Sequence, residues 1–228
     1  KWERLPALFA TLTALAVIVA SLFEILPTFL IGDNVPKIAS VKPYTPLELY
    51  GRDIYIREGC YNCHSQMLRP FIDETVRYGM NGQPAEYSKP GEFIYDHPFQ
   101  WGSKRTGPDL AREGGRRDEL WLLRHFDNPR STSPGSVMPS YPHLLTDDIP
   151  WDVIQPRVDA MAMLGVPYGQ ALEHASSMAH DQALKLSKDL EAEGGPKGMA
   201  QKDVIALIAY MQRLGHDIQL SNQTGGKL

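Results

Sequence analysis

The longest apolar stretch of the chain lies near its N-terminal end. From Leu5 to Ile31, 27 positions are apolar apart from five polar residues, which are Thr11, Thr13, Ser21, Glu24 and Thr28. About 20 apolar residues in a helix cross a hydrocarbon core of about 30 Å. A secretory signal peptide has a shorter apolar core followed by a small-residue cleavage site, which Leu26 to Asp33 does not resemble. The pattern predicts a retained transmembrane anchor within residues 1–33.

The charges around this stretch predict its orientation. Lys1 and Arg4 flank its N-terminal end, and Asp33 follows its other end. Basic residues favour the cytoplasmic side of a membrane, so we expect a cytoplasmic N-terminus and an external domain after Asp33. Glu24 lies within the outer part of the span, where a carboxylate facing lipid would be costly. We expect its carboxyl to lie near the membrane interface, to be protonated, or to contact another membrane subunit.

Two amphipathic patterns predict the main helices of the external domain. Residues 34–46 contain three prolines and indicate an extended linker. After it, apolar residues recur at three- and four-residue spacing from Leu47 to Glu58, and again from Lys202 to Leu214, where Gly215 is expected to end the helix. The first helix carries Gly51 and the second carries Tyr210.

The rest of the chain predicts insertions into a mainly α domain that spans residues 47–220. Residues 65–105 are rich in glycine, proline and aromatic residues without a long periodic run, so we expect an ordered loop excursion there. Asp118 to Phe126 fits a short helix, and residues 147–195 fit peripheral helices that form a second insertion. Met161 and Met163 lie in this helical stretch, and we expect their side chains to be packed against the rest of the domain. Residues 221–228 are polar and predict a mobile tail.

Composition narrows the function classes. The 228 residues carry a net charge of −4 without a Lys/Arg cluster, which argues against nucleic-acid binding. The 18 prolines and 19 glycines fit long irregular loops. The chain has two cysteines, and both belong to one short motif.

That motif is Cys60-Tyr61-Asn62-Cys63-His64, which has the spacing of a covalent haem c attachment site. The two thiols would form thioethers with the haem vinyl groups, and His64 would be the proximal iron ligand. A zinc ribbon would need a second cysteine pair, and a thioredoxin-like dithiol would need a βαβ pattern. Because haem c is attached on the outer side of an energy-transducing membrane, the motif independently places this domain outside the cytoplasm.

Further elements resemble class I cytochromes c. In that family the first and last helices cross closely, and a glycine of one helix admits an aromatic ring of the other, as Gly51 and Tyr210 would here. A Gly-Pro-x-Leu element follows the haem motif. By this resemblance, the carbonyl of Pro108 would hold the proximal imidazole, Leu110 would pack on the haem, and Met138 would be the distal ligand. Among the other methionines and histidines, Met67, Met80, His125 and His143 remain alternatives.

The whole chain resembles the membrane-anchored mono-haem subunit (subunit II) of cbb(3)-type cytochrome c oxidases. The resemblance rests on the anchor, the haem motif and several short segments, which are Tyr50-Gly51-Arg52, Arg69-Pro70, Glu74-Thr75, Arg77-Tyr78-Gly79, Trp101 to Leu110 and Met138-Pro139-Ser140-Tyr141. It implies an electron relay in the bacterial inner membrane, with a periplasmic haem domain, from a di-haem cytochrome subunit to haem b of the catalytic haem–copper subunit, which reduces O₂ to water.

The same resemblance suggests residues around the haem. Arg69, Arg77, Trp101 and Arg105 are candidate partners of the haem propionates. A calcium ion at the subunit interface is also implied, with Ser103 as a candidate ligand.

Three other functions remain open on the sequence. The cytochrome c subunit of a nitric oxide reductase has the same anchor and one haem c, but a shorter soluble domain than the excursion at 65–105 indicates. A free-standing membrane-anchored electron shuttle would carry the same motif. A thiol oxidoreductase would use the two cysteines without haem.

Overall fold

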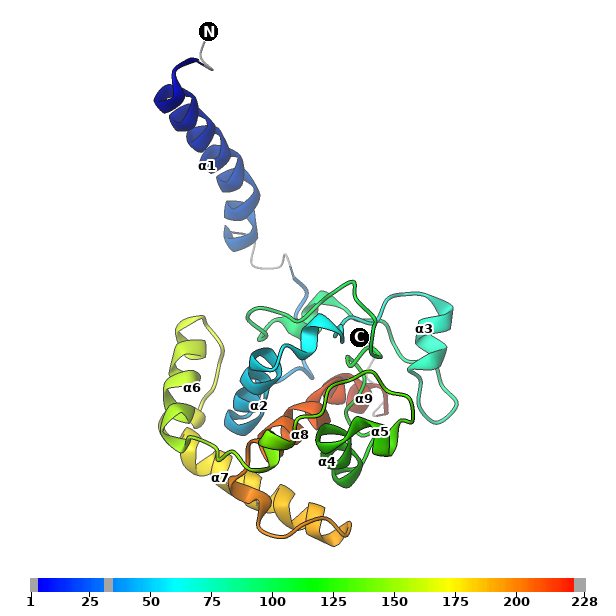
Figure 1. Cartoon of the computed structure of the whole chain (residues 1–228). Coiled ribbons are helices and arrows are strands. Elements are labelled where there is room, and N and C mark those ends of the chain that lie inside the picture. The colour runs from blue at the N-terminus through cyan, green and yellow to red at the C-terminus, as the bar shows by residue number, and fades with distance from the viewer. Residues whose placement is uncertain (1–3, 31–34, 224–228) are drawn as a thin grey trace. The chain divides into compact units, whose positions relative to one another are not determined.

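The computed structural model describes residues 4–30 and 35–223 (Figure 1). The chain divides into two units, one up to Lys37 and one from Ile38 onward, and each is treated by itself. The regular elements in the described residues are helices, and β pairing there is limited to isolated bridges. The mainly α prediction is therefore confirmed.

The first unit contains one long apolar helix, α1 (Pro6–Leu30). Its segment Pro6–Pro27 is long and apolar enough to cross a membrane. The side chain of Thr11 donates a hydrogen bond to the carbonyl of Ala7 at 2.9 Å, so this hydroxyl is satisfied within the helix. Length and composition thus agree with the predicted anchor.

The second unit is built around α2 (Pro46–Arg57). Thr45 caps this helix, because its hydroxyl accepts a hydrogen bond from the backbone of Glu48 at 3.3 Å while its own backbone N–H donates to the Glu48 carboxylate at 2.8 Å. This is a capping box, and Pro46 at the first helical position adds a residue whose missing N–H needs no partner there. The linker before it is not helical in its described residues, 35–45, as predicted.

The centre of the fold is the contact between α2 and α8 (Asp203–Arg213), which Figure 1 shows side by side. A Cβ on Gly51 would lie 1.9 Å from the carbonyl oxygen of Ala206 and 2.9 Å from Cβ of Tyr210. The glycine therefore admits the backbone of α8. The side chain of Tyr210 also begins directly against this glycine, and its ring packs at 5.5 Å centroid distances against Tyr44 and Tyr55.

Further helices surround this pair. They are α4 (Glu119–Asp127), α5 (Pro129–Thr132), α6 (Ile154–Met163) and α7 (Ala171–Ala192), with 3-10 turns η4 (Pro142–Leu145), η5 (Trp151–Val153) and η6 (Met199–Gln201). The insertion at 147–195 is mostly helical, as predicted. On α7, Ala175, Ala179 and Ala183 are fully buried at four-residue spacing, so their small side chains let this helix pack closely against its neighbours.

One local prediction is wrong. Met163 lies at the end of α6 with 88% of its surface exposed, whereas Met161 is buried. A further helix, α9 (His216–Gln223), was not predicted and covers the first three residues of the segment 221–228, whose mobility stays a prediction. Gly215 ends α8 as predicted, with φ of +75°, but the chain then begins α9. Residues 224–228 lie outside the described residues.

The excursion at 65–105 is mainly irregular, as predicted, with one short helix α3 (Ile72–Arg77) and the 3-10 turn η3 (Pro90–Phe93). Buried ion pairs hold it to the rest of the domain. The Arg112 guanidinium contacts the Glu92 carboxylate at 2.8 and 2.9 Å, and Arg52 of α2 pairs with Asp96. These four charged side chains are almost completely buried, so both pairs replace water with direct charge-assisted hydrogen bonds.

A carboxyl pair joins α4 to the end of α7 and gives a pH prediction. The Glu193 carboxylate accepts a hydrogen bond from the backbone of Leu120 at 2.8 Å. Burial, a hydrogen bond with Glu193 and the negative charges of Glu193 and Asp189 raise the pKa of Glu119 to about 7. The folded chain therefore binds more protons than the unfolded chain between the ordinary glutamate pKa and pH 7. The free energy of unfolding should fall as the pH rises through this range.

Replacing Glu119 with Gln should flatten that pH dependence, because the amide keeps a donor toward Glu193 without a charge. Denaturant unfolding of the detergent-solubilised chain at several pH values measures this. Glu173→Gln, at an exposed position of α7, is the matched control and should keep the wild-type slope. If the free energy of unfolding of Glu119→Gln depended on pH as steeply as that of the wild type, the raised pKa of Glu119 would be contradicted.

Candidate haem site

The cysteine motif forms a tight turn directly after α2. Gly59 adopts a left-handed conformation with φ of +69°, and Cys60–Asn62 then form the 3-10 turn η2. The backbone N–H groups of Cys63 and His64 both donate to the carbonyl of Cys60, at 3.1 and 2.9 Å. The thiol of Cys60 is half-buried against the main core and that of Cys63 is exposed.

The environment of Cys60 does not suit thiol redox chemistry. Burial, together with the nearby charges of Glu58 and Cys63, raises the pKa of Cys60 to about 12. A redox dithiol needs a low-pKa thiolate as its nucleophile. The surroundings of this cysteine therefore argue against a thiol oxidoreductase.

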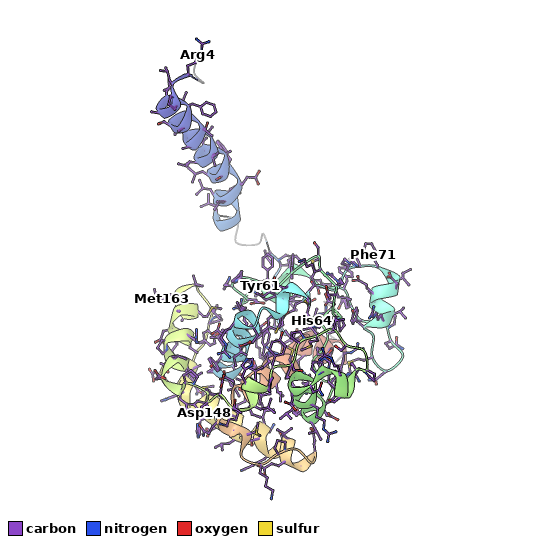
Figure 2. All side chains as sticks on the ribbon, viewed as in Figure 1. Arg4, Tyr61, His64, Phe71, Asp148 and Met163 are labelled. Carbon is purple, nitrogen blue, oxygen red and sulfur yellow. The ribbon has the colours of Figure 1, made fainter. Side chains whose placement is uncertain are left out.

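The imidazole of His64, labelled in Figure 2, is held in one orientation. Its Nδ1 lies 2.8 Å from the carbonyl oxygen of Pro108, which only accepts hydrogen bonds, so Nδ1 carries the proton and Nε2 carries a free lone pair. Burial lowers the pKa of His64, although the bond to Pro108 opposes this, and so favours the neutral ring that binds metals. Tyr55 donates to the His64 carbonyl at 2.9 Å and fixes the backbone.

Gly107 allows this arrangement, and sequence reasoning did not assign it a role. A Cβ at this position would lie 2.2 Å from Cε1 and 2.6 Å from Nδ1 of His64, so another residue would push the ring away. The Gly107 N–H also donates to the Cys63 carbonyl at 3.1 Å. The signal in the sequence was the glycine immediately before Pro108.

The buried carboxylate of Asp109 was also missed as a site residue. It accepts hydrogen bonds from the backbone of Met67 at 3.0 Å and of Ala111 at 2.9 Å, while the Asp109 N–H donates to the hydroxyl of Tyr78 at 2.8 Å. These bonds tie the Gly107–Leu110 segment to the chain that follows His64. Leu110 is half-buried against the main core.

The loop carrying Met138 lies beside the motif. Three residues after Met138, the Tyr141 N–H donates to the carbonyl of Phe126 at the end of α4, at 2.8 Å. Burial raises the pKa of Tyr141 to about 12, and the charges of Cys60, Glu58 and Cys63 add to this rise, so its phenol lies close to the motif. The Met138 side chain is half-buried against the main core.

The alternative histidines already have hydrogen-bonding partners. His143 Nε2 lies 3.2 Å from the Glu58 carboxylate. His125 Nδ1 lies 2.6 Å from the Thr132 hydroxyl, and its ring stacks on Trp121 at 4.5 Å. Burial lowers the pKa of His125 to about 4, and the proximity of His64 adds to this, so His125 lies near the site.

The four candidate propionate partners differ in whether one of their hydrogen-bond donors lacks an acceptor. Arg69 pairs with Glu74, and Arg77 lies over the Tyr78 ring at 5.5 Å. Arg105 donates to the carbonyls of Gly102 at 2.6 Å and Met67 at 2.9 Å, yet its Nε is buried without a hydrogen-bond partner among the described residues.

Trp101 resembles Arg105 in this respect. It packs among Phe93 and Phe99, and its Nε1 is likewise buried without a partner in the described part of the chain. Ser103, the candidate calcium ligand, is exposed. Residues 4–30 and 35–223 contain no cluster of three or more His, Cys, Asp or Glu side chains that could hold a metal ion.

These features fit a haem. The neutral imidazole of His64 has a free lone pair on Nε2, and the two thiols lie within one turn. The buried N–H groups of Trp101 and Arg105 lack an acceptor among the described residues. The model of the family described as cytochrome c oxidase, mono-heme subunit/FixO, matches residues 1–218. The chain therefore belongs to this family of mono-haem oxidase subunits, which implies a haem c and partner subunits. No curated protein matches the chain.

Proposed function

We propose that this chain relays electrons through one covalent haem c, from the di-haem cytochrome subunit to haem b of the catalytic haem–copper subunit of a cbb(3)-type oxidase. The observation that carries the proposal is the held imidazole of His64 within a family of mono-haem oxidase subunits. We further propose that α1 spans the bacterial inner membrane, with its N-terminus cytoplasmic and the haem domain periplasmic.

In this mechanism the haem supplies a reversible one-electron couple, and the chain holds it in place. Cys60 and Cys63 would form the thioethers, and the imidazole of His64, fixed by Pro108, would bind the iron. Met138 would supply the second protein ligand, a neutral thioether that would favour the reduced state and raise the potential. Bond-making chemistry on O₂ belongs to the catalytic subunit.

Trp101 and Arg105 are the proposed propionate partners. The buried N–H groups at Trp101 Nε1 and Arg105 Nε have no hydrogen-bond acceptor among the described residues. A propionate carboxylate would supply that acceptor. Arg69 and Arg77 stay candidates as well. Arg69 is bonded to Glu74, which also lies 4.0 Å from Arg105 Nε, and Arg77 lies over the Tyr78 ring. A calcium ion at the subunit interface also stays a proposal, in which Ser103 would supply one oxygen and the partner subunits the others.

Purification of the membrane complex tests the proposal. On blue-native electrophoresis the chain should co-migrate with b haems and copper, and the assembly should consume O₂. Migration alone would favour a free-standing shuttle, and an assembly that consumed NO rather than O₂ would favour a nitric oxide reductase. After acid–acetone extraction the denatured chain should retain its haem absorbance, whereas a chain without attached haem would overturn the proposal.

Replacing Gly107 with Ala should weaken the bond between His64 and iron. The new Cβ would force the ring off the Pro108 carbonyl, and loss of such a supporting contact costs about 10-fold or more in metal affinity. An acid titration followed at the Soret band should then shift upward by about 1 pH unit, since protons compete with iron for the imidazole. Thr106→Ala, at the exposed neighbouring position, is the control and should titrate like the wild type.

A further inference from the structure

The short helix α3 turns its apolar side chains toward solvent and a carboxylate toward the domain, and the haem site does not account for this arrangement. Ile72 is 82% exposed and Val76 is 60% exposed, whereas Glu74 is 7% exposed. Ile72 and Val76 are four positions apart, so they lie on the same face of the helix. A surface helix normally has the reverse arrangement, with its apolar face toward the core.

Phe71, directly before α3, enlarges this apolar surface and is 52% exposed. Figure 1 shows α3 at the edge of the second unit, away from α2 and α8, and Figure 2 labels Phe71 on the outer side there. We call Phe71, Ile72 and Val76 the α3 patch. Single exposed apolar residues are ordinary, but three within six positions, on an element whose inward side chain is charged, indicate a surface that a partner covers.

Hydrogen bonds on the inner side of α3 hold the patch in place. The Glu74 carboxylate accepts from the backbone N–H of Arg69 at 2.9 Å and from the Arg69 guanidinium at 2.6 Å. The Thr75 carbonyl accepts from the backbone of Ala85 at 2.8 Å. These bonds keep the apolar face of the helix outward, so the patch is preorganised for binding.

The charges around the patch favour a protein partner over a lipid surface. Residues 69–77 contain two basic residues, Arg69 and Arg77, and two acidic residues, Asp73 and Glu74, so their net charge is zero. Peripheral binding to anionic lipid uses an excess of Lys and Arg beside the apolar side chains. A protein interface instead has an uncharged apolar centre within a polar rim, which is the arrangement here.

The α3 patch is also connected to the haem site. Tyr78 follows α3 directly, and its hydroxyl accepts a hydrogen bond from the backbone of Asp109 at 2.8 Å. Asp109 follows Pro108, whose carbonyl holds the imidazole of His64. Because an electron passes only between centres that lie close together, a relay subunit is expected to bind its redox partners through surfaces beside its haem.

We propose that the α3 patch is the apolar centre of a docking surface for a haem-bearing partner subunit of the same oxidase. The inference rests on the proposed function, because membership in a family of oxidase subunits implies partner subunits. The partner would supply an uncharged apolar surface that removes the three side chains of the patch from water. The exposed charges of Asp73 and Arg77 would lie at the rim of this contact.

Photo-crosslinking in the membrane-bound complex tests the inference. A benzophenone side chain in place of Ile72 should form an adduct with a haem-bearing subunit of the oxidase, whose peptide mass spectrometry identifies. The same group in place of Met163, which is 88% exposed at the end of α6, is the control and should not react with that peptide. The absence of an adduct at position 72 would overturn the inference, as would adducts there only with lipid, with a second copy of the chain or with a subunit that lacks haem.

Ile72→Lys and Val76→Lys measure how much the patch contributes to assembly. A charge at the centre of an interface loses water without gaining a partner, so the association of this chain with the b haem should weaken by about 10-fold or more. The ratio of b haem to haem c that survives dilution of the purified complex measures this. Met163→Lys is the control and should keep the wild-type ratio. Because Ile72 and Val76 are exposed, both variants should keep the wild-type thermal midpoint and haem spectrum, which separates lost docking from lost folding.

The outcomes distinguish this inference from the proposed function. A wild-type ratio in both Lys variants of α3 would overturn the docking surface even if the wild-type chain assembles and relays electrons. An equal loss in Met163→Lys would also overturn it, because the effect would then not be specific to α3. A wild-type chain that migrates alone would overturn the proposed function, and the docking surface with it.

Discussion

Replacing Gly51 with Ala should destabilise the cytochrome domain by about 3 kcal/mol or more, which is the upper end of the usual cost of overpacking. The added Cβ would lie 1.9 Å from the carbonyl oxygen and 2.6 Å from the carbonyl carbon of Ala206. These are backbone atoms, so no side-chain rotation relieves the clash and the two helices must separate. Thermal unfolding of the full-length chain should show a midpoint lower by about 6–12 °C.

Gly102→Ala is the control for this prediction. A Cβ there would meet its nearest atom, the Tyr61 carbonyl oxygen, at 4.0 Å, which is an ordinary contact. Its unfolding midpoint should lie close to that of the wild type. Equal midpoints for Gly51→Ala and the wild type would mean that α2 and α8 do not pack through this glycine.

The effect of Gly51→Ala should also reach the haem site. The turn that carries Cys60 begins at Gly59, directly after α2, and Tyr55 of the same helix holds the His64 carbonyl. A displaced α2 would move the cysteines relative to Pro108. The visible spectrum of the variant should therefore change together with its stability.

The helices could be predicted from the sequence because their signals are local. α2 and α8 have apolar residues at three- and four-residue spacing, and Thr45, Pro46 and Gly215 mark their ends through short-range chemistry. The length of α1 follows in the same way from one uninterrupted apolar run. The helix α9 was not predicted because its polar sequence lacks a long apolar stripe.

The contacts of the excursion could not be predicted in this way. Asp96 pairs with Arg52 across 44 positions, and Glu92 pairs with Arg112 across 20. Neither pair has a periodic signature, and a charged residue in a loop is usually solvated. Only the packed fold distinguishes these buried charges from exposed ones such as Lys104.

The candidate site falls between these cases. Cys60, Cys63 and His64 come from a contiguous motif, and the bond from His64 to Pro108 follows the predicted Gly-Pro-x-Leu element. The support from Gly107, Asp109 and Tyr55 depends on atoms brought together by folding. The free donors of Trp101 and Arg105 were likewise visible only once the burial of each N–H was known.

If Met138 is the distal ligand, as we propose, replacing it with Ala should lower the haem potential. A thioether ligand favours the ferrous state of a haem, and its loss would remove that stabilisation. Because axial ligands spread haem potentials over about 0.8 V, we expect a fall on the order of 100 mV or more. Redox titration, together with spectra of the oxidised and reduced chain, measures both changes.

Met67→Ala is the matched control, since Met67 is also half-buried and its backbone is tied to Asp109 and Arg105 beside the site. Those bonds involve backbone atoms, so the substitution preserves them and removes only the thioether. The control should keep the wild-type potential and spectra. If instead Met67→Ala lowered the potential and Met138→Ala did not, the distal ligand would be Met67, and the loop held by Tyr141 and Phe126 would only cover the haem.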